Sequence, residues 1–542
     1  MADKQLPARP NLAQYKKQAK ELAHHCALSD ADALFRVRRH HPRIHAHPET
    51  APQASLTDAQ LVLAREHGFE SWPRFAAHIE TLRIIRSVEA ITDPIAAFIE
   101  VACVPRHSGH LSGDLEHAEL ILQRNPEVAT ANIYTAAILG DEPTVRRFLS
   151  SDPSLATSKG GPYEWDALTH LCFSRYLQHD ATRADAFLHT AEALLQAGAS
   201  ASTGFYEMID HPNPRPILES AIYAVSCIAR HPELTRLLLA HGADPNGDEE
   251  TAYHVAEGYD NTVTRILLED GSLTPKSLAT ILLGKADWHD EDGLQLALDH
   301  GADPNFMAQW GTTALCHSLR RDNGLIMIEM LLDHGADPAI IGTRDDRSAI
   351  QIAAHRGRGD VLRAFEQRGF SLDPGGVDAL IAACAKGDRE SIRLLTTQDP
   401  DLVDEILVRG GTMLAEFAGN ANLEGLRCLV DLGVPSGALY KEGDAYFGIA
   451  RDSTALHVAA WRAWPAAVHF LIAAGTPINA LDSDGRTALQ LAVKATVESY
   501  WKYRRSPESV AALLDAGATT TGVDIPCGYD DVDKLLRHAT QT

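Results

Sequence analysis

The stretch Thr454–Gly485 reads TALHVAAWRAWPAAVHFLIAAGTPINALDSDG, and residues 487–521 read TALQLAVKATVESYWKYRRSPESVAALLDAGATTT. Their openings lie 33 residues apart. Self-similarity at a fixed period of this size is typical of repeat arrays. Thr454 can cap a first helix with its hydroxyl, and Gly475 suits the left-handed residue that ends a second one. The stretch therefore predicts two short helices followed by a hairpin loop.

Further copies of this unit precede it. LLLAHGADPN ends at Asn246, ALDHGADPN at Asn305 and MLLDHGADPA at Ala339, and the openings TAYHVAEG, TTALCHSL and SAIQIAAHRG lie nearby. Openings and closings together indicate about twelve repeats between residues 95 and 540. One unit cannot bury its own apolar face, so neighbouring units are expected to stack into a continuous core.

The opening TALH, the closing GADPN and the 33-residue period resemble those of the ankyrin-repeat family. This resemblance implies an all-α fold, namely a solenoid of about 12 helix-turn-helix repeats with hairpin fingers, over residues 91–542. It also places His254 and His457 at the histidine of the repeat opening, where the ring is expected to hydrogen-bond the neighbouring turn. DSDGRTAL is then a hairpin of the family and not the start of a calcium loop.

Residues 1–90 do not follow the repeat and predict a small N-terminal helical domain. Its first helix should be capped by Asn11, a third helix should start at Thr57 and Asp58, and a further short helix should start at Trp72. LPARPNL and GFESWPRF resemble the leader found before many bacterial ankyrin arrays. A histidine-rich stretch, with His40, His41, His45 and His47, is interrupted by prolines that prevent a fixed ligand spacing. We therefore expect no metal site and no cofactor.

The charge and composition of the chain limit the kinds of binding partner that are expected. The formal net charge is −24, with +4 on residues 1–86 and −28 on the remainder. An acidic array repels phosphate backbones, so nucleic acid is not expected, whereas a basic or aromatic protein segment is favoured. No apolar stretch is long enough to span a membrane, and no secretory signal is evident, so a cytoplasmic location is expected. The 8 cysteines stand singly among apolar residues and predict buried thiols.

Three loops are longer than the repeat requires, and they are rich in aromatic residues. Enlarged fingers are expected near residues 159–166, 200–216 and 436–452. Aromatic side chains dominate binding hot spots, although long fingers could also pack on each other and bury their rings. The candidate partner-binding residues are Tyr163, Trp165, Phe205, Tyr206, Trp310, Tyr446, Phe447 and Trp461.

These features favour a protein-interaction module or scaffold that binds a partner through its fingers and concave face. The alternative is an enzyme or small-molecule binder with a pocket between the enlarged fingers, where Glu164, Asp210, His211 and Asp444 offer acid–base groups. The chain has no P-loop, GxSxG, HExxH or dinucleotide motif, which weakens the case for an enzyme and leaves no catalytic residue assigned.

Overall fold

The computed structural model describes residues 4–7, 10–42, 54–105, 109–111, 115–208, 214–372, 375–499 and 502–541. The chain divides into two compact units, Met1–Asp248 and Glu249–Thr542. The predicted division between residues 90 and 91 stays a prediction.

The first unit begins with a group of helices that packs around its own core. These helices are α1 (Leu12–Ala27), α2 (Ala31–His40), α4 (Leu56–Glu66) and α5 (Trp72–Glu89). Asn11 caps α1 as predicted, since its side chain accepts a hydrogen bond from the Ala13 amide at 2.8 Å. The start expected at Thr57 is wrong by one residue, because Ser55 and Asp58 form a capping box and α4 begins at Leu56. The helix expected to be short after Trp72 runs for 18 residues.

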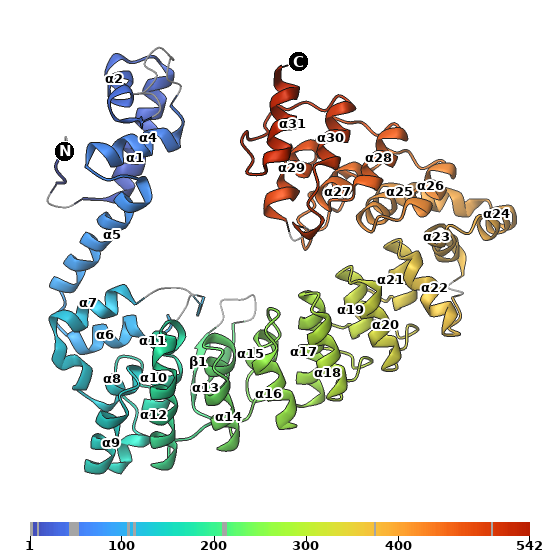
Figure 1. Cartoon of the computed structure of the whole chain (residues 1–542). Coiled ribbons are helices and arrows are strands. Elements are labelled where there is room, and N and C mark those ends of the chain that lie inside the picture. The colour runs from blue at the N-terminus through green and yellow to red at the C-terminus, as the bar shows by residue number, and fades with distance from the viewer. Residues whose placement is uncertain are drawn as a thin grey trace. The chain divides into compact units, whose positions relative to one another are not determined.

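Helix pairs follow in the same unit, as Figure 1 shows. The pairs are α6 (Pro94–Ala102) with α7 (Glu116–Arg124), α8 (Ile133–Ile138) with α9 (Glu142–Ser151), α10 (Ala167–Cys172) with α12 (Ala184–Gln196), and α13 (Ala221–Tyr223) with α14 (Pro232–Ala240). The short helix α11 (Arg175–His179) lies between α10 and α12, and α13 continues into a π turn, Ala224–Ile228. Strands β1 (Gly204–Met208) and β2 (Pro216–Ser220) form an antiparallel hairpin before α13.

The second unit continues the pairing and ends with helix α31 (Asp530–Gln541). Its first helices are α15 (Glu250–His254), α17 (Pro275–Asp287), α19 (Ala314–Arg320), α21 (Ala349–His355), α23 (Gly376–Lys386), α25 (Asp401–Gly419), α27 (Ala455–Trp461) and α29 (Ala488–Glu498). Its second helices are α16 (Thr262–Asp270), α18 (Glu291–Asp299), α20 (Leu325–Asp333), α22 (Gly359–Gln367), α24 (Arg389–Gln398), α26 (Leu423–Asp431), α28 (Pro465–Ala473) and α30 (Glu508–Asp515). Strands β3 (Leu439–Tyr440) and β4 (Ser453–Thr454) pair before α27.

Within each unit, each first helix packs on the first helix of the next pair (Figure 1). Over the described residues of both units this gives twelve pairs, which confirms the predicted all-α repeat solenoid. Narrow first helices such as α27 bury small and medium-sized Ala, Leu and Val side chains, which lets neighbouring backbones approach closely. His457 Nδ1 accepts a hydrogen bond from the Thr454 amide, and Nε2 donates to the carbonyls of Ala480 and Arg486 at 3.1 Å, as the family resemblance implied. His254 differs, because it pairs with Glu250 and Glu257.

The turn inside most pairs of the second unit contains a left-handed residue. In the second unit, glycine occupies this position at Gly357 and Gly387, whereas Asp322, Ala421 and Ala463 adopt φ values between 53° and 54°. A non-glycine residue in this region costs about 1–2 kcal/mol. At Asp322 the side chain compensates for this cost through the buried contacts described below.

The cysteines are free, seven of them buried and Cys527 partly exposed, as the sequence predicted for most of them. No helix in the described part of the chain is both long and apolar enough to cross a membrane. The cytoplasmic location stays a prediction.

Candidate functional site

A buried charge cluster joins turns of the second unit that are far apart in sequence. Asp322 is 1% exposed and accepts two hydrogen bonds from Arg356, at 2.6 and 2.7 Å. It also accepts one from Arg462 at 2.8 Å and one from the amide of Asn420 at 3.1 Å. Burial alone would raise the pKa of Asp322, but Arg356 and Arg462 outweigh it and hold the pKa far below the usual range. The carboxylate is therefore the fixed anionic centre of this cluster.

The loop between α26 and α27, residues 436–452, folds against this cluster. Phe447 is buried beneath the Arg462 guanidinium, which lies 4.2 Å from its ring centroid. Tyr446 stacks against the Arg321 guanidinium at 3.7 Å, and its hydroxyl donates to the Asp287 carbonyl at 3.4 Å. The indole of Trp461 donates to the Phe447 carbonyl at 2.6 Å. The aromatic residues of this finger thus fasten it to repeats that precede it by more than 100 residues.

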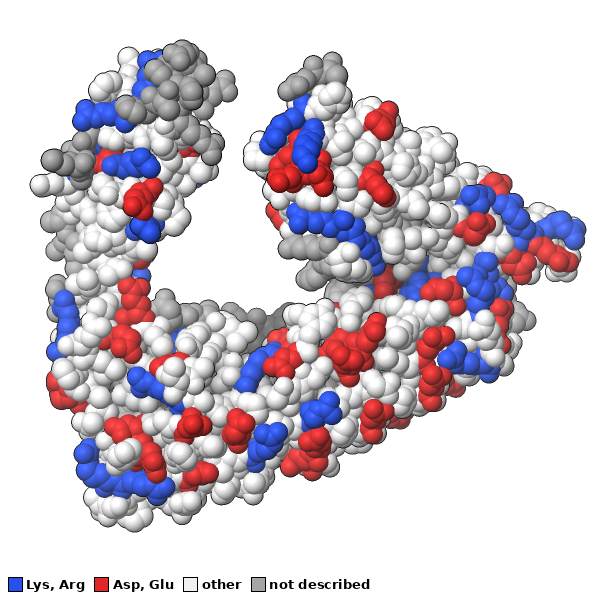
Figure 2. Space-filling view, viewed as in Figure 1, with Lys and Arg blue, Asp and Glu red and all other residues white. Residues whose placement is uncertain are grey.

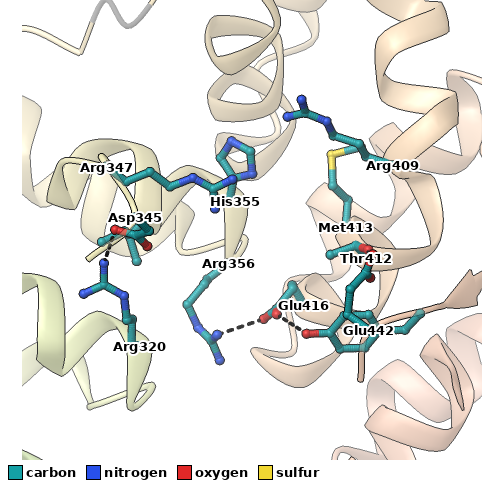
Figure 3. Close-up of a pocket in the computed structure, with 12 residues that line it drawn as sticks. Arg320, Asp345, Arg347, His355, Arg356, Arg409, Thr412, Met413, Glu416 and Glu442 are labelled. Atoms are coloured by element: carbon teal, nitrogen blue, oxygen red, sulfur yellow. Dashed lines mark hydrogen bonds and ion pairs between the residues drawn. The ribbon is translucent and has the colours of Figure 1, made fainter. Parts of the chain in front are cut away.

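A polar pocket with a volume of about 440 Å³ opens beside the finger (Figure 3). One wall comes from the end of α19, the loop before α21 and α21 itself, and the other comes from α25 and the segment after β3. The pocket is lined by Arg320, Asp345, Arg347, Ile352, His355, Arg356, Arg409, Thr412, Met413, Glu416, Tyr440 and Glu442.

Two of the lining cations have no ion-pair or hydrogen-bond partner among the described residues. Arg347 and Arg409 extend from opposite walls, and His355 lies between them in Figure 3. The other guanidiniums are engaged, since Arg320 pairs with Asp345 at 2.7 Å and Arg356 pairs with Asp322. A guanidinium presents a planar fork of donors that matches a carboxylate or phosphate. The pocket therefore offers two available guanidinium groups to an anion.

His355 is held in one orientation. Its Nε2 lies 2.7 Å from a carboxylate oxygen of Asp378, which also accepts a hydrogen bond from Gln351 at 2.9 Å. The His355 contact lowers the pKa of Asp378 to about 2. A fixed carboxylate selects the tautomer with the proton on Nε2, and this leaves Nδ1 as an acceptor.

On the facing wall, the pKa of Glu416 is raised, whereas that of Asp378 is lowered. Its carboxyl accepts from the Tyr440 hydroxyl at 3.0 Å and lies 3.2 Å from Arg356. Burial raises the pKa of Glu416, Arg356 opposes this effect, and Asp322 and Asp444 add to it. A carboxyl with a raised pKa can hold a proton at a pH where an ordinary glutamate has lost it.

The first unit holds four of the predicted binding residues, and two of them are buried. Trp165 stacks on Phe205 with centroids 4.3 Å apart, and both rings also pack on Phe173. Tyr163 is half-buried against Trp165, and its hydroxyl donates to the Glu100 carbonyl at 3.3 Å. Tyr206 is 65% exposed. The side chains of Tyr206 and Tyr163 are therefore accessible to a partner, whereas the buried rings of Trp165 and Phe205 stabilise the loops that hold them.

The second unit holds the other four. Trp310 and Tyr446 are 39% and 45% exposed, Trp461 is partly buried and Phe447 is buried. Trp310 lies 6.2 Å from Tyr253 between ring centroids. The structure therefore brings Tyr446, Phe447 and Trp461 together, and partner binding by these residues stays a prediction.

The acid–base residues of the alternative hypothesis are not assembled in the described residues of either unit. Glu164 is exposed in the first unit, and Asp444 lies 4.0 Å from Arg356 in the second. Asp210 and His211 lie outside the described residues, as do His45 and His47. His41 is buried and pairs with Asp58 at 2.9 Å.

Sequence reasoning missed the pocket because its residues come from helix ends spaced over more than 120 positions. The sequence offered one indication of the pocket, because Arg347 and Arg409 are basic residues in a chain with a strong acidic excess. Acidic and basic side chains are interspersed on the visible face of the second unit and form no single acidic patch (Figure 2).

No protein-family model matches the chain. Among solved structures, the chain is similar to the human ASB11 ankyrin repeat domain, at 18% identity and a TM-score of 0.21. That similarity covers 44% of this chain and 98% of the domain. The helix pairs, their period and the interposed hairpins described above are what define the fold as an ankyrin-type solenoid.

Proposed function

We propose that the chain is a protein-interaction module whose polar pocket receives an acidic group of the partner. The group is an Asp or Glu side chain or a C-terminal carboxylate. The supporting observation is the pair Arg347 and Arg409, which face the pocket without partners among the described residues. Stacked-repeat proteins present extended surfaces of this kind to protein partners.

The size and lining of the pocket support this proposal. A volume of about 440 Å³ accommodates a side chain with its adjacent backbone. The Thr412 hydroxyl donates to Glu442 at 3.2 Å and can instead turn to an incoming carboxylate. The exposed rings of Trp310 and Tyr446 belong to the same unit and offer contact area for the rest of the segment. A partner with basic or aromatic residues around an acidic anchor would suit both the net charge and the pocket.

The test uses fluorescein-labelled peptides of one sequence, varied only at the anchor residue and at the C-terminal group. The anchor residue is Glu, Gln or Lys, and each peptide is made with a free and with an amidated C-terminus. Binding to the full chain is measured by fluorescence anisotropy. A charge-assisted hydrogen bond contributes about 1.5–3 kcal/mol, so Arg347→Met with Arg409→Met should weaken acidic-peptide binding at least tenfold.

Arg393→Met is the matched control, because Arg393 is exposed on the second helix α24 and lines no part of the pocket. Its affinities should equal those of the wild type. Equal affinities for the Glu, Gln and Lys peptides, or no change in the double variant, would show that the pocket is not the recognition site.

A second candidate function is the binding or conversion of a small carboxylate in the same pocket. The observation that favours it is the His355–Asp378 pair, which lines the pocket opposite Glu416, a carboxyl whose pKa burial raises. Thermal-shift screening of mono- and dicarboxylates would detect such a ligand. A shift that His355→Gln abolishes, without any peptide binding, would favour this candidate over the first.

A further inference from the structure

A histidine and two glutamates meet in the first unit, away from the polar pocket. Glu207 on β1 and Glu219 on β2 lie on the same face of the hairpin, since Phe205 pairs with Glu219 and Glu207 pairs with Ile217. His110 approaches this face from the segment before α7. One ligand atom from each of the three side chains lies within 4.8 Å of the other two.

The three side chains are largely withdrawn from solvent. His110, Glu207 and Glu219 are 12%, 14% and 8% exposed, and the Phe173 and Tyr223 rings lie beside the imidazole. Two carboxylates in such surroundings repel each other, and a divalent cation coordinated by both would relieve that repulsion.

Both ring nitrogens of His110 face polar groups of the site. Nε2 lies 3.3 Å from Glu207, whereas Nδ1 lies 3.1 Å from the Tyr223 hydroxyl and 3.8 Å from Glu219. When Nε2 binds a metal, Nδ1–H can donate to the tyrosine oxygen and fix the ring. Metal–ligand distances of about 2.0–2.2 Å place tetrahedral ligand atoms about 3.4 Å apart, so ligand atoms that lie within 4.8 Å of one another must approach by side-chain rotation when an ion binds.

We propose that His110, Glu207 and Glu219 form a divalent transition-metal site, with Zn²⁺ as its best-suited occupant. One nitrogen and two carboxylate oxygens are a ligand set that zinc accepts, and three protein ligands leave a fourth position for water or a partner group. The bound ion would tie the β1–β2 hairpin to the segment that holds His110.

The second unit provides an internal control with the same residue types. His254 lies between Glu250 and Glu257 and contacts them at 2.9 and 3.0 Å. Within the described part of the chain, only the His110 group brings three such ligand atoms within reach of one ion. The His254 group is an ion-pair arrangement.

The experiment measures Zn²⁺ binding to the full chain after chelation and dialysis, by titration against a chromophoric chelator and by metal analysis. We expect one Zn²⁺ per chain that is held at micromolar concentration or tighter. Glu207→Gln, Glu219→Gln and His110→Gln should each weaken this binding at least tenfold, whereas His254→Gln should leave it unchanged. Circular dichroism of each metal-free variant checks that the fold is retained.

The visible absorption of Co²⁺ gives a second readout, because its bands report ligands in direct contact with the ion. Bands that appear in the wild type and vanish in Glu219→Gln support the site. Zinc binding that all three variants retain, or an absence of stoichiometric binding in the wild type, would overturn it and leave His110 as an ion-pair partner of the glutamates.

Discussion

Lowering the pH should destabilise the first unit through one buried histidine. His170 is fully buried, its Nδ1 donates to the Asp166 carbonyl at 2.9 Å, and its Nε2 has no hydrogen-bond partner among the residues that the structure describes. Burial lowers the pKa of His170 from 6.5 to about 4, and the Asp166 contact only partly opposes this effect. The folded unit therefore holds a neutral imidazole at a pH where the unfolded chain is already protonated.

The sign and size of the effect follow from proton linkage. Between pH 6.5 and pH 4 the unfolded state binds more protons than the folded state, so the free energy of unfolding falls as the pH falls. Each pKa unit corresponds to about 1.36 kcal/mol, which gives a total of about 3.4 kcal/mol for this group. From pH 7 to pH 5 alone, the expected loss is about 2 kcal/mol.

Urea unfolding followed by tryptophan fluorescence measures this loss, and Trp165, 5.4 Å from His170, is a local reporter. The comparison is with His170→Gln, which is neutral at every pH. The other histidines titrate equally in both proteins, so their contributions cancel in the difference. We expect wild type to lose about 2 kcal/mol more than the variant between pH 7 and pH 5. Equal losses in the two proteins would refute the assignment of a buried neutral His170.

Three further perturbations test other parts of the structure. Asp322→Asn should cost about 3–5 kcal/mol in urea unfolding because it leaves two guanidiniums without their shared anion, whereas Asp346→Asn, at an exposed left-handed turn, should change stability by less than about 0.5 kcal/mol. Gly411→Ala should lower the melting temperature, since its methyl group would overlap the Leu439 carbonyl, even though alanine favours a helix by about 1 kcal/mol. A native-state thiol titration should find one rapidly reacting cysteine, Cys527, and all 8 only after denaturation, because the other seven side chains are buried and burial raises the pKa of thiols such as Cys103 and Cys384. Rapid reaction of a second thiol would show that a repeat opens readily.

The repeat period was enough to predict most of the fold because each repeat contains the local signals for its own helices. Thr454 is the N-cap of α27 as predicted, its hydroxyl hydrogen-bonds the His457 ring at 2.8 Å, and His457 bonds the next turn as the family opening implies. These interactions span few residues or one repeat, so a 33-residue pattern is sufficient to predict them.

The pocket could not be predicted in the same way. Arg347, just before α21, and Arg409, in α25, line the same pocket because α23 stacks between these two helices and brings them to one face. The aromatic content of the fingers was correctly identified, but composition does not distinguish an exposed ring such as Tyr206 from a buried one such as Phe205. That difference depends on strand register, since alternate residues of β1 face opposite sides.

The Asp322–Arg462 contact gives the second unit a mechanical property that a simple stack of repeats lacks. In an ideal solenoid each repeat touches only its neighbours, and a chain pulled from its ends comes apart one unit at a time. Here a single carboxylate holds guanidiniums that lie 34 and 140 positions further along the chain, and the 436–452 finger reinforces the connection. This contact links the first and the last of the helix pairs from α19 to α27. Under a pulling force these pairs should therefore unfold together, in a single step.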